Sequence, residues 1–168
     1  MHFALVDRIQ SLSSESATTL KNVSLAEEYL QDHFATFPVL PGVMMIECLV
    51  QAARLVMEQR DREMEQRDRE MEHRDREAAA TSTHRPALPT RWVLGKARAV
   101  KYGAFVRPGA ALRIEVTLAK LNDDGSADFK AHALLLEPNL TTPSAETQLP
   151  VAASGRITLR PTRAAVFS

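Results

Sequence analysis

The chain has 168 residues, 45% apolar and 25% charged, which is typical of one globular domain. Its 21 Lys and Arg balance 21 Asp and Glu, so no net charge would attract nucleic acid or an anionic membrane. The single cysteine, Cys48, excludes an internal disulfide framework and a multi-cysteine zinc site. The sequence begins without a signal-like segment and has no apolar run near 18 residues, so we expect a cytoplasmic protein.

Two short strands, Phe3–Gln10 and Ala17–Val23, are predicted first, on either side of the Ser-rich Ser11–Ser16. A helix is predicted to follow Pro41-Gly42. Nine of the eleven residues 43–53 are apolar and cover every face of this helix, so we expect it to be buried all round.

Two polar residues interrupt this apolar helix. Glu47 and Gln51 are four residues apart and therefore share a face. A carboxylate buried among apolar side chains is costly unless it is paired or protonated, which makes Glu47 a candidate functional acid. The alternative is a structural carboxylate tied to an arginine, at a subunit contact for example.

A histidine lies on the loop that leads into the helix. His33 precedes Pro38 and Pro41, which stiffen the loop, and the helix start then presents free amides. Although a lone histidine is usually structural, an imidazole, a carboxyl group and oriented N–H donors together suit proton transfer next to a carbonyl.

A seven-residue unit occurs three times in residues 57–77, as MEQRDRE, MEQRDRE and MEHRDRE. Only the methionine recurs as an apolar residue, whereas a coiled-coil seam needs two apolar positions per heptad. The unit is rich in helix formers and in charged neighbours at helical spacing. We therefore expect a solvated extension of the helix, without chemistry of its own, ending in a linker at 78–90; the alternative is a partner-binding arm.

Strand patterns dominate the rest of the chain. Trp92–Tyr102 is a long candidate strand, and Leu112–Leu118 and Phe129–Leu135 alternate as half-buried strands do. Turns are predicted at Arg107-Pro108-Gly109 and at Asn122-Asp123-Asp124-Gly125. Ser154–Arg160 is predicted as the last strand, after a polar loop at Pro138–Pro150. The predicted architecture is α+β, an antiparallel sheet with one principal helix.

The stretch His33–Gln51 resembles the active-site signature of β-hydroxyacyl-acyl-carrier-protein dehydratases of the FabZ/FabA type. The matching residues keep the family spacing: His33, Phe34, Pro38, Pro41, Gly42, Val43, Glu47 and Gln51. Two further segments agree, Leu5-Val6-Asp7-Arg8 near the start and Val100 to Leu112 later. The sequence departs from the family pattern at Asp32, Ala35, Thr36 and Ala110.

The resemblance implies one hotdog domain over 1–168, with the repeat as an insertion at 57–77, and a homodimer or a trimer of dimers. It implies that His33 is the catalytic base and that Glu47 of the partner subunit is the acid. The amides of Gly42 or Val43 would bind the thioester oxygen, and Gln51 would orient Glu47 or a water. Metal ions and cofactors are not expected.

The implied reaction removes water from 3-hydroxyacyl thioesters on acyl carrier protein, as in fatty acid biosynthesis; a coenzyme A thioester is the other substrate form. The acyl chain would lie in a tunnel whose candidate lining is Phe34, Phe37, Val43, Met44, Tyr102 and Phe105. A basic rim of Lys96, Arg98, Lys101 and Arg107 would meet the acidic carrier. The alternatives are a hotdog thioesterase or enoyl hydratase, and a non-catalytic carrier-binding hotdog, which the unusual loop residues and the charged repeat favour somewhat.

Overall fold

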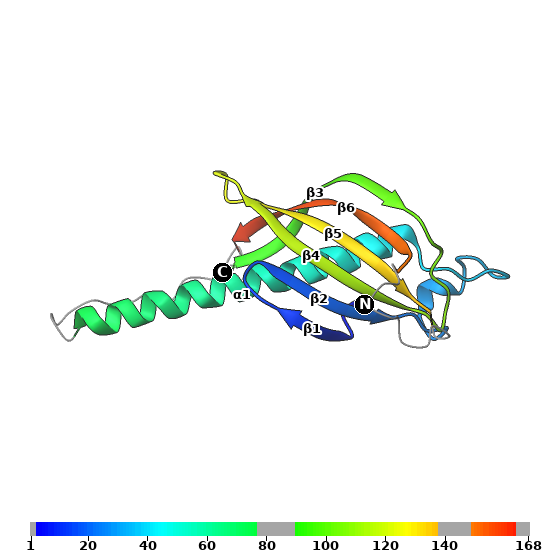
Figure 1. The fold of residues 1–168 in the computed structure, drawn as a ribbon, viewed down its shortest axis with the longest axis horizontal. Helices are drawn as coiled ribbons and strands as arrows, with labels where there is room; N and C mark the ends of the chain where they lie inside the picture. The colour runs from blue at the N-terminus through cyan, green and yellow to red at the C-terminus, as the bar shows by residue number, and fades with distance from the viewer. Residues whose placement is uncertain (1–2, 77–89, 138–148, 164–168) are drawn as a thin grey trace, which may run out of the picture.

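One long helix lies across the concave face of an antiparallel sheet (Figure 1). The computed structural model describes residues 3–76, 90–137 and 149–163. In chain order the elements are β1 (Arg8–Leu12), β2 (Ser16–Asn22), the 3₁₀ helix η1 (Glu28–Leu30), α1 (Gly42–Arg76), β3 (Thr90–Tyr102), β4 (Ala111–Leu121), β5 (Ala127–Leu136) and β6 (Val151–Arg163).

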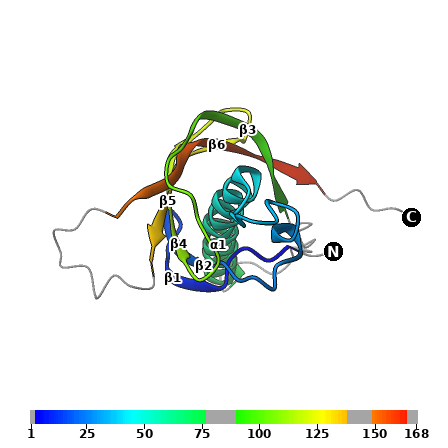
Figure 2. The ribbon, with the colours of Figure 1, turned by 90° about the vertical axis from the view of Figure 1, so that its right-hand side faces the viewer.

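The six strands pair in the order β1-β2-β4-β5-β6-β3, and every pair is antiparallel. Seen along α1, the sheet curves around the helix (Figure 2). The predicted hotdog fold is confirmed, and β1 and β3 are the two edge strands.

The alternation predicted for the central strands is confirmed. Side chains of Leu112, Ile114 and Val116 on β4 are buried, as are those of Phe129 and its alternate neighbours on β5, while the residues between them are more exposed. The predicted hairpin connects these strands: the Asn122 amide donates to Ser126 O at 2.8 Å, and Gly125 has the φ of +79° that favours glycine.

The first predicted strand is wrong at its start. Strand β1 begins only at Arg8, because the segment Phe3–Leu5 is bonded to a helix side chain instead of a strand. The predicted Ser-rich break is also narrower, since it is a turn in which Ser13 Oγ accepts the amides of Glu15 and Ser16.

The first part of α1 is less completely covered than predicted. Residues such as Cys48, Leu49 and Ala52 are buried under the sheet, but Val43 is 70% exposed and Ile46 is half-buried. The sheet of one chain covers only one side of the helix, so the apolar residues on the other side stay uncovered in the single chain.

The helix continues into the repeat as far as Arg76 and projects beyond the sheet (Figure 1). Two ion pairs at i,i+4 spacing, Glu58–Arg62 and Glu65–Arg69, stabilise it weakly, both at 3.7 Å. Trp92 Nε1 donates to Asp61 Oδ2 at 2.9 Å and ties the first repeat to β3. The predicted linker, apart from Thr90, and positions 138–148 of the predicted polar loop lie outside the described residues.

Burial of Cys48 gives a pH-dependent contribution to stability. Desolvation raises the pKa of its thiol from 9.0 to about 12. Above pH 9 the unfolded chain loses this proton while the folded chain keeps it, so the free energy of unfolding falls by up to about 1.4 kcal/mol per pH unit. Urea unfolding at pH 8 and pH 10 should show a larger loss for the natural chain than for Cys48→Ala. Equal losses of unfolding free energy in the two proteins would contradict this contribution of Cys48.

Candidate active site

His33 is held in one tautomer by the loop in front of α1. Its Nδ1 lies 3.0 Å from Val39 O, and the Val39 amide donates to His33 O at 2.9 Å. Because a carbonyl oxygen only accepts, Nδ1 carries a proton, and in the neutral ring Nε2 then holds the lone pair. The half-buried ring stacks on Phe34, with 4.5 Å between ring centroids. This arrangement is suited to a general base that acts through Nε2.

The start of α1 presents amides next to an aromatic ring. The amides of Gly42 and Val43 have no acceptor within the helix, whereas those of Met44 and Met45 both donate to Pro41 O. A Cβ on Gly42 would lie 2.8 Å from the ring of Tyr102, so glycine allows this ring to lie against the helix start. The first turn of α1 can therefore donate hydrogen bonds to an anionic oxygen.

The sequence predicted that Glu47 is buried among apolar side chains, but in the single chain it is not. Its side chain is 35% exposed, and its Oε1 accepts from Gln51 Nε2 at 3.1 Å and lies 3.4 Å from Arg54 Nη1. A partly exposed pair of this kind is worth at most about 1 kcal/mol. The alternative of a structural carboxylate tied to an arginine is compatible with this contact.

Gln51 links Glu47 to the N-terminal segment. Its Oε1 accepts the Leu5 amide at 2.8 Å, and its Nε2 donates to Phe3 O at 2.8 Å as well as to Glu47. The predicted pairing of Glu47 and Gln51 on one helix face is therefore present. Both polar ends of Gln51 are used, which fixes the orientation of its amide.

The predicted tunnel residues fall into two groups. Four aromatic rings are exposed in the single chain, from 39% to 70%: Phe34, Phe37, Tyr102 and Phe105. Phe37 and Phe105 meet edge to face at 5.9 Å, and Arg107 lies 4.6 Å from the centroid of Phe37. Met44 instead packs against the core. An aromatic surface thus lies around the start of α1, without a cover from its own chain.

The predicted basic rim is not uniform. Lys96 and Lys101 on β3 are exposed, whereas Arg98 pairs with Asp128 at 3.3 Å and Arg107 lies on Phe37. Two of the four cations therefore already have contacts within the chain.

An open cavity of about 620 Å³ lies between the N-terminal segment and α1. Its lining includes Val6, Arg8, Gln51, Arg54 and Leu55, so it adjoins the side chains that contact Glu47. The ranges that the structure describes contain no group of three or more His, Cys, Asp or Glu side chains that could hold a metal ion.

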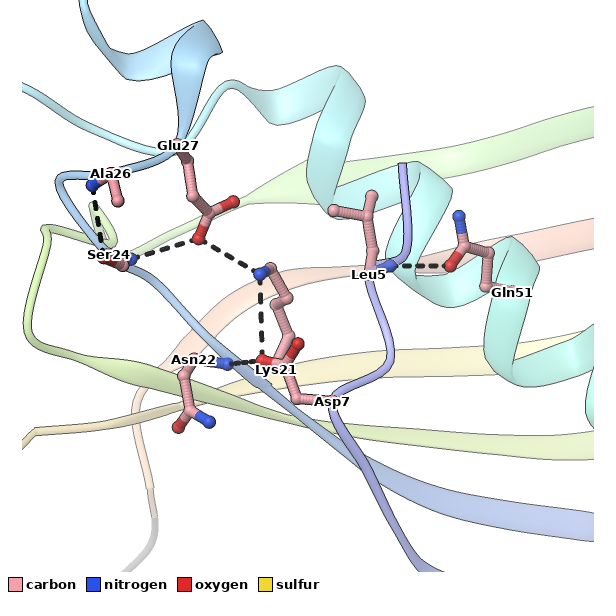
Figure 3. Close-up of polar contacts among 8 residues, drawn as sticks. All are labelled: Leu5, Asp7, Lys21, Asn22, Ser24, Ala26, Glu27 and Gln51. Carbon is pink, nitrogen blue, oxygen red and sulfur yellow. Dashed lines mark hydrogen bonds and ion pairs between the residues drawn. The ribbon is translucent and has the colours of Figure 1, made fainter. Parts of the chain in front are cut away.

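Sequence reasoning missed two charged contacts, the pair of Arg54 with Glu47 and a second group around Lys21. Arg54 is seven residues after Glu47, a spacing that places both on one helix face and was a usable signal. The second group is a cluster of the buried Lys21 with the less buried Asp7 and Glu27 (Figure 3). Lys21 follows Ala17 and Thr19 at the inward positions of β2, so the strand period indicated its burial.

Comparisons with known proteins agree with one another. The family model of the FabA-like domain matches residues 1–95. A 3-hydroxyacyl-[acyl-carrier-protein] dehydratase FabZ from Oenococcus oeni is 36% identical over 132 residues, which cover 77% of this chain and 75% of that protein. The FabZ of Clostridium perfringens is 28% identical over 76% of this chain and 73% of its own length. The FabZ of Lactococcus lactis is 47% identical, but only over 51 residues, 30% of this chain and 35% of that protein.

Two solved structures share the fold. The dehydratase heterocomplex ApeI:P from Xenorhabdus doucetiae matches with a TM-score of 0.53 and 15% identity, over 94% of this chain and 98% of that chain. A mutant acyl-CoA hydrolase from Staphylococcus aureus matches with a TM-score of 0.50 and 10% identity, over 91% of this chain and 76% of that chain. At these identities the two matches support the fold only.

None of the helices in the described ranges combines the length and the apolar composition that a bilayer crossing requires.

Proposed function

Because this chain belongs to the family of FabA-like domains, we propose that it removes water from 3-hydroxyacyl thioesters carried on an acyl carrier protein, which gives 2-enoyl thioesters. The observation that supports this best is the contact between His33 Nδ1 and Val39 O, which leaves Nε2 as the acceptor atom of the neutral ring. The substrate class comes from the names of the relatives, and the chemistry comes from the residues around the start of α1.

His33 is the proposed base. The thioester carbonyl makes the C2 proton acidic, and Nε2 accepts this proton while Nδ1 stays bonded to Val39 O. Negative charge then develops on the carbonyl oxygen. Amides of Gly42 or Val43 at the start of α1 stabilise this charge because they have no acceptor within the helix and need no reorganisation.

Glu47 of a second subunit is the proposed acid. Hydroxide is a poor leaving group, so the C3 hydroxyl must receive a proton as its bond to carbon breaks. Gln51 holds Oε1 of Glu47 in one position. A dimer would also cover the exposed apolar residues near the start of α1, among them Val43 and Phe105, each 70% exposed in the single chain. The same contact would place a carboxyl group near His33 and exclude water from both.

The acyl chain and its carrier have separate proposed contacts. The chain would lie along the aromatic surface of Phe34, Phe37, Tyr102 and Phe105, which a partner subunit would close into a tunnel. Lys96 and Lys101 are free to meet an acidic carrier, and these contacts would weaken as salt is added. Arg98 and Arg107 would contribute less because of their contacts within the chain.

The test is to follow the reverse reaction, hydration of an enoyl thioester by the purified protein. We expect the absorbance of the conjugated thioester to fall and a 3-hydroxyacyl thioester to form, without release of free thiol. Release of thiol would instead indicate a thioesterase. Binding of an acyl carrier protein without any turnover would indicate the non-catalytic alternative.

A further inference from the structure

Lys21 is a buried cation held between two carboxylates (Figure 3). Its side chain is only 7% exposed, and its Nζ lies 3.0 Å from Glu27 Oε1 and 3.7 Å from Asp7 Oδ2. Because an unpaired buried ammonium group is costly, these three residues must keep their relative positions in the folded chain. Each carboxylate belongs to a different segment that leads toward the proposed site.

The Glu27 side of the cluster leads to His33. Oε1 of Glu27 also accepts the Ser24 amide at 3.0 Å, which fixes the turn before η1. The carbonyl of Glu27 accepts the Leu30 amide at 3.0 Å, and Leu30 O accepts the His33 amide at 3.4 Å. Glu27 therefore fixes the start of the short helix from which the His33 loop continues.

The Asp7 side of the cluster leads to Glu47. Oδ2 of Asp7 accepts the Asn22 amide at 2.5 Å, which fixes the N-terminal segment on β2. Two residues earlier in this segment, the Leu5 amide donates to Gln51, and Gln51 in turn donates to Glu47. Figure 3 shows Asp7, Leu5 and Gln51 in this succession.

From these contacts we infer that Lys21 is a positioning residue for the two groups that its subunit contributes to the proposed dimer. It acts through Glu27 toward the His33 base of one site, and through Asp7 toward the Glu47 acid of the other. The inference rests on the proposed function. It adds that the ion cluster of each subunit, which does not itself contact the reacting groups, sets the geometry of the base in one site and of the acid in the other. A small displacement of a catalytic group lowers the rate strongly, so loss of this cluster should reduce kcat more than it affects KM.

Three variants separate positioning from stability. Lys21→Met removes the cation but leaves the half-buried Glu27 unpaired, so it lowers stability as well. Lys21→Met/Glu27→Gln also removes that unpaired charge and should regain much of the lost stability. Lys130→Met on β5 is the matched control, because Lys130 is exposed. Each protein is assayed for enoyl thioester hydration, thermal unfolding, and the ¹H–¹⁵N signals of the His33 ring.

We expect kcat to fall about 10- to 100-fold in both Lys21 variants, with KM changed less than about 3-fold, and to stay unchanged in Lys130→Met. The His33 ring signals, assigned with His33→Ala, should shift in both Lys21 variants. Recovery of kcat together with stability in the double variant would overturn the inference, and so would unchanged His33 signals. If the natural chain hydrates no enoyl thioester, the proposed function fails, and the ring signals alone decide whether Lys21 positions His33.

Discussion

His33→Ala is expected to lower kcat for hydration of an enoyl thioester by about 10²- to 10⁴-fold, because the group that takes the C2 proton in dehydration must return it in hydration. The bond from Nδ1 to Val39 O leaves Nε2 as the only ring atom that can accept a proton. Alanine removes this acceptor and the stacking on Phe34, but no fully buried packing, because the His33 ring is only half-buried. Steady-state kinetics and circular dichroism of the variant would measure activity and folding separately.

The matched control is His132→Ala. His132 is an exposed histidine on β5, on the side of the sheet away from the helix, and it should be replaceable without loss of activity. Full activity of a folded His33→Ala protein would exclude His33 as the base.

Glu47→Gln should cause a loss of similar size, about 10²- to 10⁴-fold in kcat, because an amide can neither give a proton to the C3 oxygen in dehydration nor take one from the attacking water in hydration. Glutamine keeps the size of the side chain and can still bond to Gln51. Since the contact with Arg54 is partly exposed, its loss should change the free energy of unfolding by at most about 1 kcal/mol. The free energy by which the variant destabilises the transition state therefore exceeds the change in its free energy of unfolding.

This variant also separates the two interpretations of Glu47. A structural carboxylate tied to Arg54 predicts lower stability with activity preserved, which is the reverse of the result expected here. Glu115→Gln is the matched control, because Glu115 on β4 also pairs with an arginine, Arg113, at 2.8 Å and is similarly exposed. It should lose no activity.

Much of the fold could be predicted because single segments determine it. The alternation in β4 and β5 requires one buried face, and the glycine at Gly125 requires a turn, whatever the rest of the chain does. The segment from Phe3 has the same strand-like pattern, but its partner is the side chain of Gln51 on a distant helix. Local sequence gives no sign of such a partner, so the predicted strand began too early.

The sequence predicted which elements carry the candidate site, but not the environment of its side chains. The spacing from His33 to Gln51 placed the loop, the helix start and the shared face of Glu47 and Gln51 correctly. The degree to which Glu47 is buried depends on what covers the free side of α1, and composition does not reveal that. The contacts of Lys21 and Arg54 depend on how far their side chains reach across segments, which the strand and helix periods do not fix.

The central claim is that each site takes His33 from one subunit and Glu47 from the other, and mixing the two inactive variants tests it directly. His33→Ala and Glu47→Gln subunits are denatured together, refolded and assayed for enoyl thioester hydration. A mixed dimer would hold one site with both groups intact, so random pairing should restore about a quarter of the natural activity. If the mixture stays as inactive as each variant alone, while size-exclusion chromatography finds mixed dimers, the shared site is contradicted.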